Sequence, residues 1–226
     1  MRDGLEPLTP ANYVRVTANQ LWTNLPLVTA GGLIFSALCA PAFVLGVLGR
    51  PVEMGIAFLL LISPGWTALL YMQGAIAEER RASLGMMLRA LPRVWRRSVG
   101  LGALFLVPLI ALQATLPLLA APSVPFVVWA GLAADILGVA VAGAIALYAY
   151  PLIALHDAAL FNALRNGLIL ASRYPSNTLG LLGMAVLGGL AVGYVGVALL
   201  FFLPAWYGLF VVNNCRLLVE RETGGD

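Results

Sequence analysis

Long apolar runs, separated by short polar segments, dominate the pattern of this chain. The runs begin near Leu21 and recur until about Leu218, and the first contains no charged residue over positions 21–48. A helix needs about 20 consecutive apolar residues to cross the hydrocarbon core of a bilayer. The pattern therefore predicts transmembrane helices whose apolar surface faces lipid.

We predict an all-α, polytopic membrane helical bundle that forms one domain over residues 1–226. Its six transmembrane helices are expected at about 21–48, 54–77, 98–120, 126–150, 178–198 and 199–218. The polar stretches 78–97 and 151–177 are predicted as amphipathic cytoplasmic linker helices. Five spans remain the alternative, because the last apolar region is long for one straight crossing and short for two. Two spans there require a hinge around 193–204, and Pro41 predicts a tilt or a break in the first span.

The distribution of arginine favours six spans and sets the orientation. All 13 basic residues are arginine, and positive residues gather on the cytoplasmic side of a membrane. With six spans, both termini and both linkers share that side, and only Arg50 lies outside. With five, Arg216 and Arg221 also move outside. We therefore expect cytoplasmic N- and C-termini.

Composition supports the same class, since 61% of the 226 residues are apolar and 10% are charged. A soluble domain has about 25% charged residues. The net charge of +3 is too small and too dispersed to predict nucleic-acid binding. The sequence holds no catalytic motif and no His/Cys cluster, so we predict neither an enzyme nor a cofactor or metal site.

Asp135 is the only formal charge well inside a predicted span. A carboxylate at bilayer depth is costly and is therefore a functional candidate. One interpretation is a proton, cation or substrate site in a stand-alone transporter or channel. A second is a polar tie to Gln113 or Thr115 on the preceding span, or to a partner protein. A third is an interfacial position, with span boundaries that differ from those expected. By contrast, His156 and Asp157 are interpreted as solvated residues at the interface, since no nucleophile or metal ligand accompanies them.

The first linker has a basic amphipathic pattern, in which apolar residues share one helical face and arginines share another. The two sets are Leu84, Met87, Leu88, Leu91 and Trp95, and Arg89, Arg93, Arg96 and Arg97. Arginine meets anionic lipid headgroups, and tryptophan suits the membrane interface. Topology anchoring, docking of a partner protein and lipid sensing remain open for this face.

Two further patterns concern helix packing. Gly189 and Gly193 match the small-xxx-small spacing of closely packed helices, with a seam between two copies as the alternative. A polar helix is also expected ahead of each pair of spans, around Arg15, Arg93 and Arg173. This order suggests three units of one helix and two spans each.

Three stretches resemble the YesL family of bacterial membrane proteins: 63–71, 87–97, and 150–154 followed by 164–168. They are similar to the family's Gly/Pro-rich motif leading into Thr-Ala-Leu-Tyr, to its aromatic and basic cytoplasmic segment, and to its Pro-Leu-x-Ala and Leu-x-Asn-Ala stretches. The resemblance implies a multi-pass protein of the bacterial inner membrane, associated with carbohydrate ABC import. We therefore expect an accessory or regulatory subunit that contacts the lipid bilayer and its anionic headgroups. Its expected partner is an ABC permease or a second copy of the chain.

Overall fold

The computed structural model describes residues 8–9, 11–121 and 123–224, which form helices joined by short turns, with no β-strand among them. In chain order the helices are α1 (Tyr13–Thr23), α2 (Leu25–Val47), α3 (Pro51–Ala57), the π-helix Phe58–Ile62, α4 (Ser63–Ala77), α5 (Leu84–Thr115), the 3-10 helix Leu116–Ala120, α6 (Phe126–His156), α7 (Leu160–Arg173), α8 (Pro175–Val195), the 3-10 helix Val197–Phe201 and α9 (Leu203–Thr223). The predicted all-α class is confirmed.

Five segments of the described chain are long and apolar enough to cross a membrane. They are Leu25–Val47, Pro51–Ala77, Leu84–Ala120, Phe126–His156 and Pro175–Val195. This confirms a helical membrane protein and matches the lower of the two expected span counts.

The helix expected to form a sixth span, α9, differs from these five in its surroundings. Asn213, Asn214 and Arg216 lower its hydropathy, but ten of its residues between Ala205 and Leu218 are buried in protein. A helix can carry polar groups at membrane depth when neighbouring helices provide partners. The crossing of α9 therefore stays a prediction.

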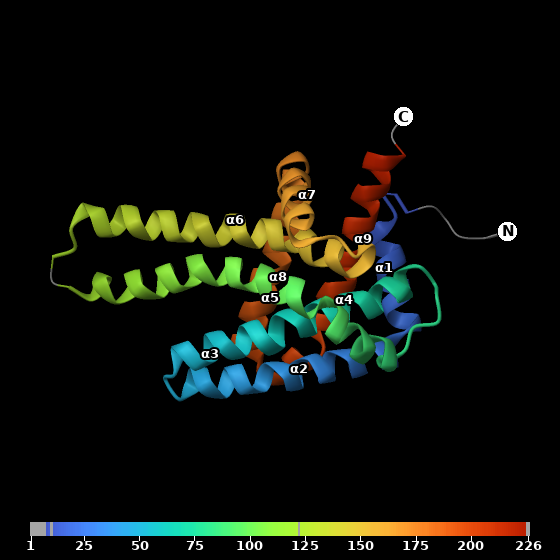
Figure 1. Ribbon diagram of the computed structural model, residues 1–226, viewed down its shortest axis with the longest axis horizontal. Coiled ribbons are helices and arrows are strands. Elements are labelled where there is room, and N and C mark those ends of the chain that lie inside the picture. The colour runs from blue at the N-terminus through green and yellow to red at the C-terminus, as the bar shows by residue number, and fades with distance from the viewer. Residues whose placement is uncertain (1–7, 10, 122, 225–226) are drawn as a thin grey trace.

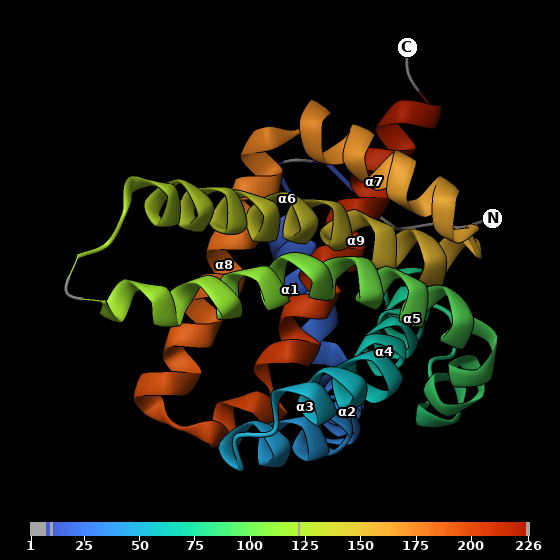
Figure 2. The same ribbon diagram turned by 60° about the vertical axis from the view of Figure 1, so that its left-hand side comes forward.

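A sharp break separates α8 from α9, within the hinge region expected around 193–204. Gly196 directly follows α8 and has φ +135°, a conformation that residues with a side chain rarely adopt. The 3-10 helix Val197–Phe201 then leads into α9, which runs back along α8 (Figure 2). The long apolar region thus forms two helices of 21 residues each.

Three helical hairpins make up the fold: α2 with α3–α4, α5 with α6, and α8 with α9 (Figure 1). A helical segment precedes each hairpin, namely α1, the first turns of α5, and α7. This is the order of the expected threefold repeat, which itself stays a prediction. The α5–α6 hairpin projects away from the rest of the molecule in both views (Figures 1 and 2).

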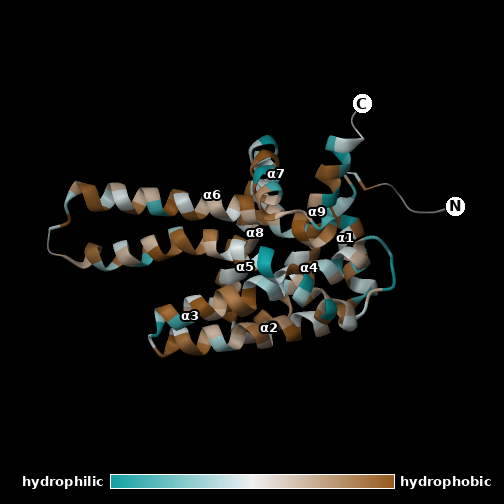
Figure 3. Ribbon diagram, viewed as in Figure 1, coloured by the Kyte–Doolittle hydropathy of each residue, from teal (hydrophilic) through white to brown (hydrophobic). Residues whose placement is uncertain are grey.

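Hydrophilic residues gather at one end of the molecule. This basic end comprises α1, the loop 78–83, α7 and the end of α9, while the projecting hairpins are mostly apolar (Figure 3). Tyr13 of α1 meets Phe210 of α9 edge-on, with ring centroids 6.5 Å apart, so the two ends of the chain pack together. Such an end suits a membrane surface, whereas the hairpins suit lipid.

The helices continue through several boundaries expected from the sequence. α2 is not broken at Pro41. α5 begins at Leu84 and contains Pro92, so only 78–83 of the first linker lies outside helices. The reason is one continuous buried stripe along α5, formed by Met87, Ala90, Val94, Ser98 and Leu101. Likewise α6 extends to His156, and α7 alone forms the helix of the second linker.

The middle of α2 is in close contact with the tip of the third hairpin. Ser36 Oγ on α2 donates to the carbonyl of Leu200 over 2.6 Å. A Cβ on Gly32 would lie 2.2 Å from the backbone oxygen of Phe201. Because a backbone atom cannot move aside cheaply, α2 needs glycine at this position.

We predict that Gly32→Ala lowers the free energy of unfolding by about 1–3 kcal/mol, the usual cost of overpacking. Gly180→Ala is the matched control, since nothing lies within 4 Å of its added Cβ. Unfolding of the purified protein in detergent, followed by circular dichroism, measures both. Equal stability of the two variants would contradict the close contact between α2 and the turn before α9.

Candidate functional site

A buried network of hydroxyl groups joins α4, α5 and α6. Ser63 and Thr67 lie one turn apart on α4, Ser98 lies on α5 and Tyr150 on α6, and all four are buried. Ser98 Oγ donates to Thr67 Oγ1 over 2.7 Å, and Ser63 Oγ lies 2.9 Å from Tyr150 Oη. Inside a bilayer such groups need protein partners, because no water is present to hydrogen-bond them.

Backbone carbonyls determine where the hydroxyl protons of this network go. Ser63 Oγ donates to the carbonyl of Ser98, and Thr67 Oγ1 donates to the carbonyl of Ser63 over 3.1 Å. Since Ser63 has only one proton, Tyr150 is the donor in the bond between their hydroxyls. All four donors of the network are therefore bound to protein acceptors.

The network joins two of the three stretches on which the family resemblance rests, and its fourth member directly follows the remaining one. Ser63 and Thr67 belong to 63–71, Tyr150 belongs to 150–154, and Ser98 directly follows 87–97. These stretches are far apart in sequence, and none of the four residues stands out as a site there. The one available signal is the i, i+4 spacing of Ser63 and Thr67, which places two hydroxyls on one helix face.

A cavity of about 160 Å³ lies beside the network, and its wall is mostly aromatic. Five of its eight lining residues have rings: Phe35, Phe58, Trp66, Phe105 and Tyr150. The rings of Phe35 and Trp66 are 5.6 Å apart and tilted by 56°, while Phe58 and Phe105 stack at 6.4 Å. The cavity is therefore lined by rings from α2, α4, α5, α6 and the π-helix.

A larger groove of about 780 Å³ adjoins this cavity, and Phe58 and Ile62 line both. It lies between the first hairpin and α5. It reaches Pro51 and Val52, at the end of the molecule opposite the basic end. Its wall is mainly aliphatic, with the amide of Gln113 as a polar group. Gln113, one of the expected partners of Asp135, thus faces this groove.

The other expected partner of Asp135, Thr115, does contact it. Thr115 Oγ1 lies 2.6 Å from Asp135 Oδ2 and 3.1 Å from the carbonyl of Ala111. This contact ties α5 to α6 within the projecting hairpin. Asp135 is half-buried and lines neither the cavity nor the groove.

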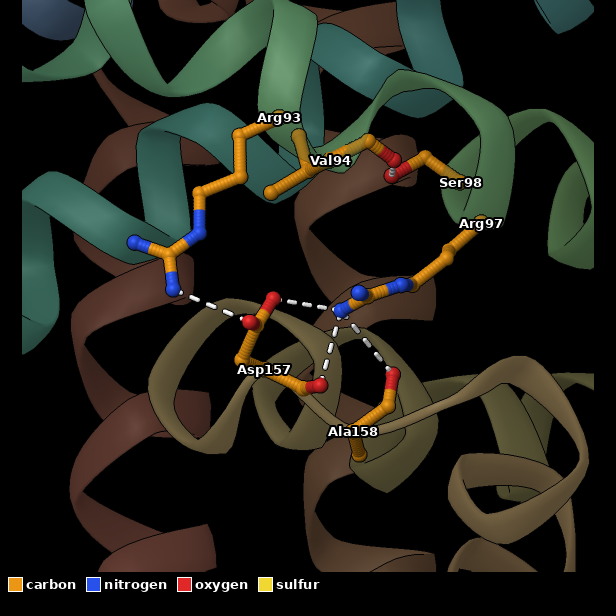
Figure 4. A network of polar contacts seen from close by, with 6 residues as sticks. All are labelled: Arg93, Val94, Arg97, Ser98, Asp157 and Ala158. Atoms are coloured by element: carbon orange, nitrogen blue, oxygen red, sulfur yellow. Dashed lines mark hydrogen bonds and ion pairs between the residues drawn. The ribbon is translucent and has the colours of Figure 1, made fainter.

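At the basic end, two arginines of α5 clamp the junction between α6 and α7 (Figure 4). Arg93 Nη2 donates to Asp157 Oδ2 over 2.9 Å, and Arg97 Nη1 bonds the other carboxylate oxygen. Arg97 also donates to the backbone carbonyls of Asp157 at 2.7 Å and Ala158 at 3.4 Å. The hydrogen bonds from Arg93 and then Arg97 lower the pKa of the Asp157 carboxyl below its usual value.

This clamp engages two of the four arginines of the expected docking or lipid-binding face, which itself stays a prediction. Arg93 and Arg97 are bound within the chain, whereas Arg89 and Arg96 are exposed. The apolar face differs as well, since Trp95 and Leu88 are exposed while Met87 is buried. The sequence indicated Asp157 only as a solvated neighbour of His156, because its partners lie about 60 positions away.

A second buried polar cluster surrounds α9. Asn213 Nδ2 donates to Thr17 Oγ1 at 2.9 Å and to Gln20 Oε1 at 2.8 Å, both on α1. Gln73 on α4 donates to the carbonyl of Ala205 at the start of α9, over 2.5 Å. These bonds tie α9 to α1 and α4, while the buried side-chain oxygens of Gln73, Asn213 and Asn214 have no hydrogen-bond partner among the described residues.

Gly189 and Gly193 do not pack against another helix of the described chain. An added Cβ at either position would have nothing within 4 Å. The expectation of close packing within the chain is therefore wrong, and the surface of α8 that carries them faces outward. A seam between two copies remains a prediction.

The comparisons with known proteins do not identify the chain: no family model, no curated protein and no solved structure matches it. The resemblance to the YesL family thus remains a prediction. Within the described residues, no three His, Cys, Asp or Glu side chains are placed to hold a metal ion together.

We predict that Ser63→Ala lowers the free energy of unfolding by about 1–2 kcal/mol, because it leaves the buried Tyr150 hydroxyl without an acceptor and removes the bond to the Ser98 carbonyl. Adding Tyr150→Phe removes the orphaned hydroxyl, so the double variant should lose less than the sum of the two single variants. Unfolding in detergent gives the double-mutant cycle. Strict additivity would contradict the bond between the two hydroxyls.

We predict that Asp157→Asn lowers stability at pH 7 by about 0.2–1 kcal/mol per ion pair, the usual range for exposed pairs. The depressed pKa means that the stabilisation is full above the ordinary carboxyl pKa of about 3.9 and is lost as the pH falls through the lower, folded value. The melting temperature should therefore fall less on acidification in Asp157→Asn than in the unmodified protein.

Asparagine removes the charge and one acceptor without straining the backbone, because Asp157 has φ +52° and asparagine also tolerates this left-handed conformation. Glu53→Gln is the control, since Glu53 lies 4.0 Å from Arg50 in an exposed pair at the opposite end. An acid response that is unchanged in Asp157→Asn would show that the clamp contributes nothing to stability.

Proposed function

We propose that the protein is an accessory or regulatory membrane subunit that binds another integral membrane protein through its α5–α6 hairpin. The observation that carries this proposal is the uncovered surface of that hairpin. Val107 is 65% exposed and Phe126 is 85% exposed. Within the described chain, the outer parts of the two helices mainly contact each other (Figure 2).

Asp135 supports a protein partner over lipid alone on this hairpin. It lies nine residues into α6, about 14 Å along the helix axis from Phe126. A carboxyl at such a depth is costly beside hydrocarbon, and its bond to Thr115 leaves further oxygen lone pairs unoccupied. A polar side chain from a neighbouring helix would occupy them and add to the affinity.

The exposed part of the basic end fits the same role. Arg89, Arg96 and Trp95 remain accessible at the start of α5. In a cytoplasmic orientation they would contact anionic headgroups or the cytoplasmic face of the partner. The resemblance to the YesL family suggests that the partner belongs to a transport system of the bacterial inner membrane, such as a carbohydrate ABC permease.

The alternative of a stand-alone transporter or channel places Asp135 in a pathway. Neither the cavity nor the groove is lined by Asp135. We therefore place the accessory role first and treat the transporter as an outcome of the test below.

We predict that the chain purifies from its native membranes, in mild detergent, with a stoichiometric membrane partner. Asp135→Leu should reduce recovery of that partner by about 5- to 30-fold, the equivalent of one polar contact between membrane helices. Quantitative mass spectrometry of the eluate measures the ratio of partner to bait. A permease among the partners would support the link to transport.

Glu53→Gln is the matched control, because it also neutralises one carboxylate but lies on the exposed turn after α2. Full partner recovery with Asp135→Leu would overturn the role of the hairpin. A chain that purifies alone, and whose flux in liposomes is lost in Asp135→Asn, would establish the transporter instead.

A further inference from the structure

The aromatic cavity beside the hydroxyl network differs from an ordinary lipid-facing depression. Five of its eight lining residues are aromatic, whereas only Phe43 and Phe58 are aromatic among the 17 that line the adjoining groove. An acyl chain needs no rings and fits the aliphatic groove well. The concentration of rings in the smaller space therefore indicates a different occupant.

The rings are placed to act on one ligand together. A cation is attracted to the face of an aromatic ring within about 6 Å of its centroid. The centroids of Phe35 and Trp66 are 5.6 Å apart, and those of Phe58 and Phe105 are 6.4 Å apart. A small ligand seated against the tilted pair of Phe35 and Trp66 would thus lie within reach of two rings at once, whereas Phe58 and Phe105 are stacked and cover part of each other's faces.

The polar residues of the wall add no competing chemistry. Ser63 and Tyr150 both line the cavity, but their protons are directed to the Ser98 carbonyl and to Ser63 Oγ. Among the described residues, no charged side chain lines it. A mainly aromatic wall whose hydroxyl donors are already bound, leaving the indole N–H of Trp66 as its remaining side-chain donor, disfavours anions and sugars, because both need several hydrogen-bond donors.

These properties also distinguish between kinds of cation. A primary ammonium group would lose its hydrogen bonds to water and find no carboxylate here. A quaternary ammonium group has no N–H bonds to lose and is held by ring faces alone, as in other aromatic cages. The size is suitable, since an apolar cavity of about 150 Å³ holds a molecule as large as benzene.

We propose that this cavity is a binding site for a small quaternary ammonium ion. The adjoining groove, which shares Phe58 and Ile62 with it, forms the approach from the end that carries Pro51. The site goes beyond the proposed subunit function and does not depend on it. It gives the chain a ligand of its own, chosen by charge and shape without a carboxylate.

The test measures binding of radiolabelled tetramethylammonium to the full chain in nanodiscs of phosphatidylethanolamine and phosphatidylglycerol. We expect saturable binding that choline displaces and that its uncharged isostere, 3,3-dimethyl-1-butanol, does not. Trp66→Leu and Phe105→Leu should each weaken binding by about 3- to 30-fold, the range for one cation–π contact.

Trp129→Leu and Phe161→Leu are matched controls, because both rings are exposed and line neither cavity. Size-exclusion profiles and thermal unfolding identify any variant that fails to fold, and Phe58→Leu then takes its place. Absence of saturable binding would overturn the proposal, as would affinities unchanged by both cavity variants. Equal displacement by the uncharged isostere would show a hydrocarbon pocket and also overturn it.

Discussion

The structure depends on one constraint: polar groups inside a bilayer must find their partners within the protein. Between helices in lipid there is little hydrophobic driving force, so close packing and hydrogen bonds hold them together. Ser63, Thr67, Ser98 and Tyr150 meet this constraint for α4, α5 and α6. The Asn213 amide meets it in part, since its nitrogen donates to α1 while its buried oxygen has no partner among the described residues. Both clusters lie toward the basic end, and this is where the three hairpins pack together.

The same constraint explains the difference between the closed end and the open hairpins. The clamp on Asp157 holds the start of α5 to the junction of α6 and α7, so the second hairpin is anchored at its base. A related contact, Arg173 with Glu222, joins the end of α7 to the end of α9. Beyond these anchors the hairpins carry few polar groups, and lipid or a partner protein can surround them. The exception is Asp135, which therefore indicates where a partner would bind.

Much of the fold could be predicted from hydropathy, because span length and the position of charges are local properties of the sequence. The five apolar segments and the break near Gly196 are of this kind. The exact helix ends were less predictable, since the buried stripe from Met87 to Leu101 continues through a segment that looks like a separate linker.

The candidate site was not predictable in this way. Ser63 and Tyr150 are 87 positions apart, and single hydroxyls in apolar runs give no pattern of their own. The arginines of α5 form a visible pattern, but only the structure shows that Asp157 binds two of them.

The cavity and the hairpin are related through α5. Ser98, Phe105 and Thr115 follow one another along this helix, at the network, at the aromatic wall and at the contact with Asp135. A ligand in the cavity would contact α4, α5 and α6 where the network joins them, and would favour whichever arrangement of these helices encloses it better. Such a ligand shifts an equilibrium only by the difference in its affinity for the two arrangements. The network already satisfies its own donors, so the arrangement of the three helices without a bound cation is also stable. Any difference in the cation's affinity for the two arrangements must then come from the rings. The aromatic wall would therefore be the part of the molecule through which a bound cation acts on the hairpin.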